Sequence, residues 1–196
     1  MSLSIGMVYD VPENRNFKPQ GHPDPVGKPG EPGVPRILDS GNRREFESGA
    51  VRDIQEGKGR CDLLPLDIVA EYLSDPILDR IEYFLRTGEV EYLYEALSVF
   101  VELHFDKAGC FKNDMDMLLE VAIHFEEGAK KYGDNNWRKG IPVRCYIDSG
   151  VRHYLKFLRG DKDEPHHRAF CWNLLCGAWT CKNKPELNDY LAGVSK

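Results

Sequence analysis

Apolar residues between positions 66 and 105 recur at intervals of three and four, the spacing of one face of a helix. The pattern breaks at Thr87-Gly88 and then resumes. No strand-like alternation competes with it, so the pattern predicts helices and, for the chain as a whole, an all-α helical bundle. The repeating positions are Ile77, Ile81, Phe84, Leu85, Leu93, Leu97, Phe100 and Leu103.

The segment 115–132 predicts another amphipathic helix, which Gly133 ends. One side is apolar and is expected to face the core, while a second side has polar residues that fit either a solvated face or a set of ligands. Glu126 is expected on the flank near the core, where a carboxylate needs a cation or a hydrogen-bond network. The expected core positions are Leu118, Ala122, Phe125, Ala129 and Tyr132, and the polar positions are Glu120, His124, Glu127 and Lys131.

Pro142 introduces a further helix, in which Asp148 and Arg152 lie one turn apart on one face. This pair fits either a surface ion pair, worth about 0.3–0.5 kcal/mol, or, together with His153, a cluster that faces phosphate. Its expected core positions are Ile147, Val151, Tyr154 and Leu158.

The sequence Asp163-Glu164-Pro165 predicts the start of a third helix. Glu164 and His167 are three residues apart, a spacing that lets two side chains on one helix face reach the same metal ion. His166 is expected to point elsewhere.

Two loops offer candidate binding chemistry. The sequence from Gly57 to Arg60 is too short for a Walker loop, but its glycines would let the backbone approach a phosphate while Lys58 and Arg60 add charge. An ordinary basic turn is the alternative. Further along, Asn136 and Trp137 lie in a polar loop, where the indole would either stack on a base or cover the end of the bundle.

Residues 1–40 contain seven prolines and no apolar period, which predicts an extended or disordered Pro/Gly-rich arm. The domain is expected over residues 41–185, followed by a tail at 186–196. Six cysteines without a CxxC pair predict reduced thiols rather than a metal site.

A formal charge of −6 and a pI near 5.6 do not provide the basic excess that nucleic acids and anionic membranes require, so we expect no direct DNA or RNA binding. No apolar run approaches the roughly 20 residues that a membrane-spanning helix needs, and the N-terminus does not resemble a signal peptide. These features predict a cytoplasmic protein without a membrane partner.

Four blocks of the sequence carry a family resemblance: GKGRCDLLP, HFEEGAKKYGDNNWRKGIP, YIDSGVRHYLKFLRGD and DEPHHRAFCWN. They resemble the phage and bacterial dATP/dGTP diphosphohydrolases, which are similar to the MazZ enzymes and related to the all-α MazG-like NTP pyrophosphatases. The resemblance covers about residues 41–64 and 118–180, so the segment of about 66–115 looks like a helical insertion. It implies a bacterial or phage-infected host cytoplasm and a homo-oligomer.

The activity implied by the resemblance is metal-dependent hydrolysis of dATP or dGTP to the monophosphate and pyrophosphate. Mg²⁺ or Mn²⁺ is expected, with Co²⁺ as an alternative, at two or more ions per site. The candidate metal ligands are Glu120, Glu126, Glu127, Asp148, Glu164 and His167; the catalytic candidates are Glu126, Glu127, Glu164 and Arg152; the candidates for substrate contact are Lys58, Arg60, Lys131, Asn136, Trp137 and Arg152.

The sequence departs from the MazG pattern in one respect, because it contains no ExxE motif. This absence leaves open an alternative function, a catalytically inactive module that binds a nucleotide or a phage or host partner.

Overall fold

The computed structural model describes residues 41–104 and 112–190, so the predicted arm at 1–40 lies outside the described residues. The all-α prediction is confirmed, with the addition of one short hairpin. In chain order the elements are β1 (Arg43–Glu45), β2 (Val51–Asp53), η1 (Cys61–Leu63), α1 (Leu66–Leu73), α2 (Pro76–Thr87), α3 (Glu91–His104), α4 (Asp114–Tyr132), η2 (Asn136–Lys139), α5 (Val143–Arg159), α6 (His166–Asn183) and η3 (Pro185–Leu187).

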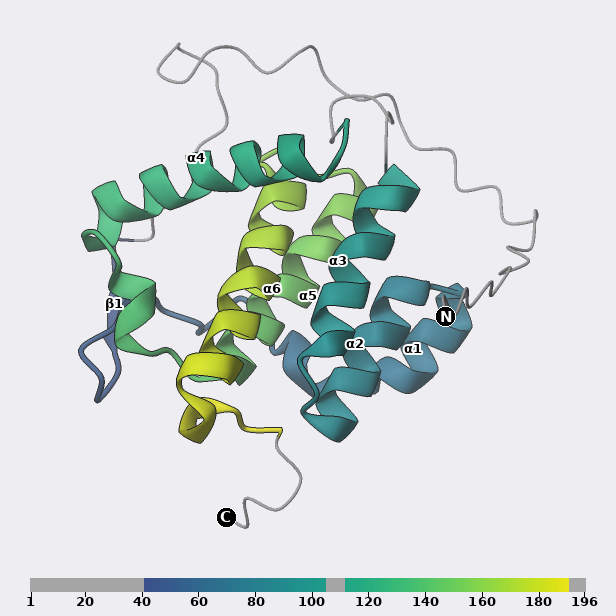
Figure 1. The fold of residues 1–196 in the computed structure, drawn as a ribbon, viewed down its shortest axis with the longest axis horizontal. Coiled ribbons are helices and arrows are strands. Elements are labelled where there is room, and N and C mark those ends of the chain that lie inside the picture. Colours follow the sequence, from purple (N-terminus) through teal and green to yellow (C-terminus); the bar gives the residue numbers. More distant parts are fainter. Residues whose placement is uncertain (1–40, 105–111, 191–196) are drawn as a thin grey trace, which may run out of the picture.

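The helices α5 and α6 form the most extensive helix pair and lie at the centre of the molecule (Figure 1). On one side they are flanked by α1, α2 and α3, while α4 crosses over one end of the bundle and the β1–β2 hairpin lies below its C-terminal half (Figure 1). Local sequence signals explain several helix ends. Asp75 caps the start of α2 by accepting from two backbone amides, and Gly88 and Gly160 end α2 and α5 in left-handed conformations.

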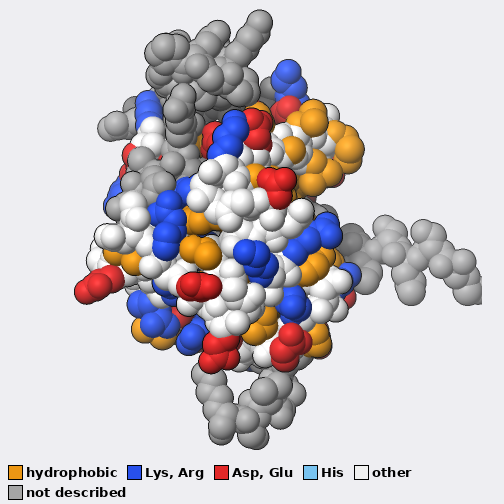
Figure 2. All heavy atoms as spheres, turned by 90° about the vertical axis from the view of Figure 1, so that its left-hand side faces the viewer, with side chains coloured by type: hydrophobic (Ala, Val, Ile, Leu, Met, Phe, Trp, Pro, Cys, Tyr) orange, Lys and Arg blue, Asp and Glu red, His pale blue; other side chains and the backbone are white. Residues whose placement is uncertain are grey.

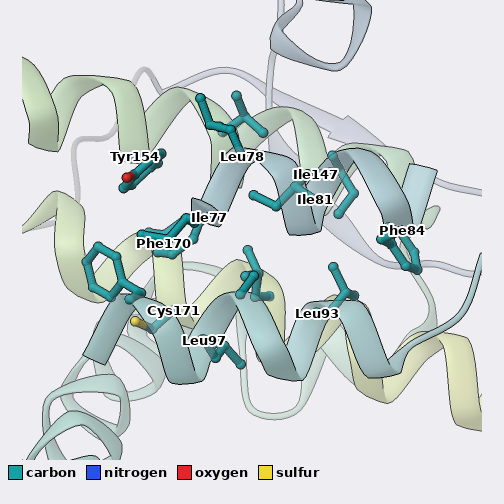
Figure 3. Close-up of a cluster of buried hydrophobic side chains, with 14 of the residues drawn as sticks. Ile77, Leu78, Ile81, Phe84, Leu93, Leu97, Ile147, Tyr154, Phe170 and Cys171 are labelled. Carbon is teal, nitrogen blue, oxygen red and sulfur yellow. The ribbon is translucent and has the colours of Figure 1, made fainter. Parts of the chain in front are cut away.

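The main core lies where α2 and α3 meet α5 and α6 (Figure 3). The ring of Phe100 on α3 lies 4.8 Å from that of Phe170 on α6 and 6.0 Å from that of Tyr154 on α5, between ring centres. The predicted insertion therefore shares one continuous core with the segments on either side of it. Packing also continues beyond residue 185, because the Asn188 side chain is buried and donates to the Gly88 carbonyl at 3.2 Å.

The predicted core face of α4 is wrong. The buried side chains of α4 are Met117, Val121 and His124, whereas Leu118 is 44% exposed. The buried stripe is thus shifted by one residue, or about 100° around the helix. The sequence offers apolar residues on both sides of this helix, and only contact with α6 determines which side is buried.

The hairpin was not predicted, because each strand has only three residues and little alternation. It is held by tertiary contacts with the helical segment. The Asn136 side chain accepts from the Val51 amide at 2.9 Å and donates to the Val51 carbonyl at 2.8 Å. Ala50, in the turn, is buried against Ile141 and Tyr146.

The described cysteines, Cys61, Cys145, Cys171, Cys176 and Cys181, form no disulfide with one another, in agreement with the expected reduced thiols. Across the described part of the chain, no helix has the length and apolar character needed to cross a membrane.

Candidate functional site

A cavity of about 910 Å³ lies between the hairpin, the C-terminal half of α4, and the helices α5 and α6. Its volume is within the range of about 300–1,000 Å³ that is typical of small-molecule sites. Figure 2 views the molecule from the hairpin side, where basic and acidic side chains are interspersed on the surface. The charged side chains that line the cavity are Arg44, Arg52, Lys58, Arg152 and Lys156, and Asp53, Glu126, Asp134, Asp148 and Glu164.

Asp148 and Arg152 form the polar wall that α5 contributes. The Asp148 side chain is 1% exposed and accepts from Arg152 Nη2 at 2.7 Å, from Gln55 Nε2 at 2.7 Å and from the Cys61 amide at 2.7 Å. Arg152 also donates to the Gly59 carbonyl at 3.0 Å. The interpretation of this pair as a surface ion pair is therefore wrong, because the segment before α1 covers it.

Arg52 of β2 is a partly buried anchor that the sequence pattern did not predict. Its guanidinium donates to the Cys145 carbonyl at 3.1 Å, to Ser149 Oγ at 3.1 Å and to Asn173 Oδ1 at 3.0 Å. It also lies over the rings of Tyr146 and Trp172. One cation thus joins the hairpin to α5 and α6 and places positive charge at the cavity wall. The basic residue in the short segment Val51–Asp53 was the only local signal for it.

A group of three potential metal ligands lies where α5 meets the start of α6. Nδ1 of His153 is 3.0 Å from Nδ1 of His166 and 3.4 Å from Oε1 of Glu164, and the remaining separation, from His166 Nδ1 to Glu164 Oε1, is 3.7 Å. Burial lowers the pKa of His153 well below its ordinary value, and the neighbouring His166 acts in the same direction. The ring is therefore neutral at pH 7, the form that binds metal.

The sequence predicted that Glu164 pairs with His167, but the histidine beside Glu164 is His166. Because α6 begins at His166, Glu164 precedes the helix and the helical spacing of three does not apply to it. His166, which was expected to point elsewhere, lies beside Glu164, and its side chain is 1% exposed. The His167 ring lies against Phe157.

The remaining candidate carboxylates are held by cations rather than gathered together. Glu127 accepts from Arg168 Nη2 at 3.2 Å, and Glu120 lies 3.7 Å from Arg168 Nη1. Burial raises the pKa of Glu120, and Arg168 opposes this effect. Glu126 was expected near the core, but its side chain is 59% exposed at the cavity rim and pairs with Lys130. This placement was wrong, because Glu126 is two residues, or about 200°, from the buried His124.

The predicted phosphate contacts divide into two groups. Lys58 lines the cavity and lies 3.6 Å from Asp53. Arg60 instead pairs with Asp62 at the surface, and Lys131 pairs with Asp53 at 3.0 Å; neither is among the residues that line the cavity. The loop from Gly57 to Arg60 is a turn, with Gly57 in a left-handed conformation.

Asn136 and Trp137 both line the cavity, but they are engaged in packing. Asn136 uses both ends of its amide on the hairpin backbone. Trp137 lies against Phe125, with ring centres 5.3 Å apart, and against Trp179, with ring centres 5.0 Å apart. These contacts favour the interpretation that Trp137 covers one end of the bundle.

His124 is buried in the cavity wall, and among the described residues its Nδ1 has no hydrogen-bond partner. Burial lowers its pKa to about 3, and the positive charges of Arg168 and Arg52 act in the same direction. Between this value and the ordinary pKa of 6.5, the unfolded chain binds the proton more tightly than the folded chain does. The contribution of His124 to stability is complete above pH 6.5 and is lost as the pH falls through this window.

We therefore expect the substitution His124→Phe to reduce the sensitivity of the protein to acid. Below pH 6.5, the free energy of unfolding of the variant should rise relative to that of the wild type by about 1.4 kcal/mol for each pH unit. Urea unfolding at pH 7.5, 6.0 and 5.0 measures this shift. Parallel pH profiles for the two proteins would show that His124 does not couple folding to protonation.

Residues 110–190 match the family described as dATP/dGTP diphosphohydrolase, N-terminal. The match includes α4, α5 and α6 and confirms the resemblance over residues 118–180; the resemblance of residues 41–64 lies outside it and stays a prediction. No curated protein and no solved structure matches the chain.

Proposed function

We propose that the protein hydrolyses a purine deoxynucleoside triphosphate to the monophosphate and pyrophosphate in this cavity. The proposal starts from the match of residues 110–190 to the dATP/dGTP diphosphohydrolase family. The family description supports nucleotide hydrolysis in general. The observation that carries the finer proposal is the cavity itself, which is large enough for a nucleotide and combines basic side chains, aromatic rings and a group of potential metal ligands.

The basic and acidic side chains of the cavity have different roles in the proposed binding of the substrate. Three basic residues line the cavity: Lys58 from the loop before η1, and Arg152 and Lys156 from α5. They would contact the phosphates, whose negative charge attracts both ammonium and guanidinium groups. Asp148 keeps the Arg152 guanidinium in place through its 2.7 Å hydrogen bond. Phe125 and Trp172, which also line the cavity, offer ring faces on which a purine could stack.

The donor atoms of His153, Glu164 and His166 fit a divalent ion beside these cations. When bound, such an ion supplies an activated water and neutralises phosphate charge. The basic residues would then hold the triphosphate against the metal, and Arg152 would stabilise negative charge that develops at the reacting phosphate.

One observation favours the alternative, a catalytically inactive module that binds nucleotide or a partner. Arg168 holds both Glu120 and Glu127, so these carboxylates are already neutralised and do not converge with Glu164. A centre in which several carboxylates bind two or more ions would require them to exchange this partner for metal.

Incubation of the protein with each dNTP and Mg²⁺, Mn²⁺ or Co²⁺, followed by chromatography of the products, tests the proposal. We expect dAMP or dGMP together with pyrophosphate. Release of orthophosphate, or no turnover with either purine substrate, would contradict the proposed reaction. Metal-dependent binding of the nucleotide without turnover would favour the inactive module.

We expect Lys58→Met to raise the KM for the purine substrate roughly ten- to a hundredfold, because a charge-assisted hydrogen bond contributes about 1.5–3 kcal/mol. Steady-state kinetics at saturating metal measures the change. Lys130→Met is the matched control, since Lys130 is exposed on α4 and is not among the residues that line the cavity. Equal KM values for the two variants would show that Lys58 does not contact the substrate.

A further inference from the structure

The atoms of His153, Glu164 and His166 are spaced like ligands of one ion. With metal–nitrogen and metal–oxygen distances of about 2.0–2.2 Å, two ligand atoms at tetrahedral or octahedral angles lie about 2.9–3.5 Å apart. The separations of 3.0 and 3.4 Å from His153 Nδ1 fall in this range. The third, 3.7 Å between His166 Nδ1 and Glu164 Oε1, is only slightly longer. A small rotation of one carboxylate would complete the geometry.

Asp163 fixes the orientation of the most buried ligand. Its carboxylate lies 2.7 Å from Nε2 of His166, so this nitrogen carries the proton and donates it. The other nitrogen, Nδ1, then accepts from Nδ1 of His153 at 3.0 Å, and a metal ion between the two rings would take the place of that shared proton. A carboxylate that orients a metal-binding histidine through its second nitrogen is a common feature of metal sites. Lys156 in turn holds Asp163, with its ammonium 2.9 Å from the carboxylate.

The group has an open side and a closed side. His153 and Glu164 line the cavity, whereas the His166 side chain is 1% exposed and lies behind them. Three protein ligands on one side, with the other side directed towards a cavity, is the arrangement of metal sites that bind water or substrate. Arg152 and Lys156 line the same part of α5 and would attract an anion to the open side.

We propose that His153, Glu164 and His166 form a three-ligand site for one borderline divalent ion such as Zn²⁺, Fe²⁺ or Co²⁺, in preference to Mg²⁺. Two imidazole nitrogens and one carboxylate oxygen make up a donor set that suits these ions, whereas Mg²⁺ prefers oxygen ligands throughout. The ion proposed for this site differs from the cofactor expected from the sequence. The sequence predicts two or more Mg²⁺ or Mn²⁺ ions bound mainly by carboxylates, whereas this site binds one ion through two imidazole nitrogens and one carboxylate oxygen. Its role in catalysis rests on the proposed function, but its metal binding does not.

Titration of Co²⁺ into the metal-free full-length chain, followed by visible absorption, tests the site without a reaction. We expect one ion per chain, with ligand-field bands. Glu164→Gln and His153→Gln should each weaken Co²⁺ binding by about 100-fold or more, because loss of an outer partner alone typically costs about 10–100-fold. Asp163→Asn should weaken it by that smaller factor. His167→Gln, at the neighbouring histidine outside the group, is the matched control and should bind as the wild type does.

Circular dichroism and urea unfolding of each variant separate loss of a ligand from loss of the fold. The site is overturned if Co²⁺ produces no bands, if the folded variants bind as the wild type does, or if His167→Gln alone loses binding. It is also overturned if equimolar Mg²⁺ displaces Co²⁺. Co²⁺ binding without dNTP hydrolysis would support the metal site and contradict the proposed function. Hydrolysis that needs only Mg²⁺ and is retained in Glu164→Gln would support the proposed function and show that the metal site has no role in catalysis.

Discussion

We expect Asp148→Ala to lower the free energy of unfolding by about 3 kcal/mol or more, because removal of one partner of a buried ion pair leaves the other unpaired at a cost of about 3–5 kcal/mol. The Asp148 carboxylate accepts from a guanidinium, an amide side chain and a backbone amide, and its side chain is 1% exposed. Arg152 remains 15% exposed, so the loss should lie towards the lower end of this range. Urea unfolding at pH 7.5 measures it.

Two further variants make this measurement specific. Asp79→Ala, which removes a 47% exposed carboxylate from its pair with Arg80, should change stability by less than about 1 kcal/mol. The double variant Asp148→Ala/Arg152→Ala should lose less than the sum of the single losses, because no unpaired guanidinium remains. Strict additivity would mean that the two side chains do not stabilise each other and that the Asp148 contribution comes from the segment around Cys61.

The second large effect is expected at Phe100, in the segment outside the family match. Phe100→Ala should lower the free energy of unfolding by about 3–5 kcal/mol, since a fully buried ring that contacts α5 and α6 would be replaced by a cavity. Urea unfolding monitored by tryptophan fluorescence reports on it well, because all three tryptophans lie outside α1–α3.

The matched control is Tyr72→Ala, which removes a 68% exposed ring from α1 and should have little effect. If α1–α3 belong to the same cooperative unit as α5 and α6, wild type and Phe100→Ala should each show one transition with the same slope. A fluorescence transition that Phe100→Ala leaves in place would instead show that α1–α3 unfold separately, as a dispensable insertion would.

Much of the helical layout could be predicted from short-range features. Apolar spacing located α2, α3 and α5, the Thr87-Gly88 break separated two of them, and Pro142 and Pro165 preceded the starts of α5 and α6. These features act within a few residues, because a helix is built from bonds between neighbouring turns and is ended by local backbone conformation. The motif blocks likewise indicate the family, since each is a contiguous run of the sequence.

The site was predicted only in part. Asp148, Arg152, Lys58 and Glu164 do line one cavity, although they come from separate segments. The choice between His166 and His167 failed because it depended on where α6 begins, and helix starts are poorly determined by sequence alone. Arg52 was missed because its strand is too short to show a pattern, and its three acceptors come from distant residues.

The sequence by itself thus determined the helical class of the protein, most of its helix boundaries and the family resemblance of residues 118–180, because each depends on local spacing or on contiguous motifs. Tertiary structure alone decided which side of α4 is buried, that Arg168 holds Glu120 and Glu127, and that His153 meets His166 beside Glu164. These outcomes depend on packing between helices and on the burial of charge, which forces each buried ion to find a partner from another part of the chain. The group of potential ligands is a product of that packing, and no spacing in the sequence encodes it.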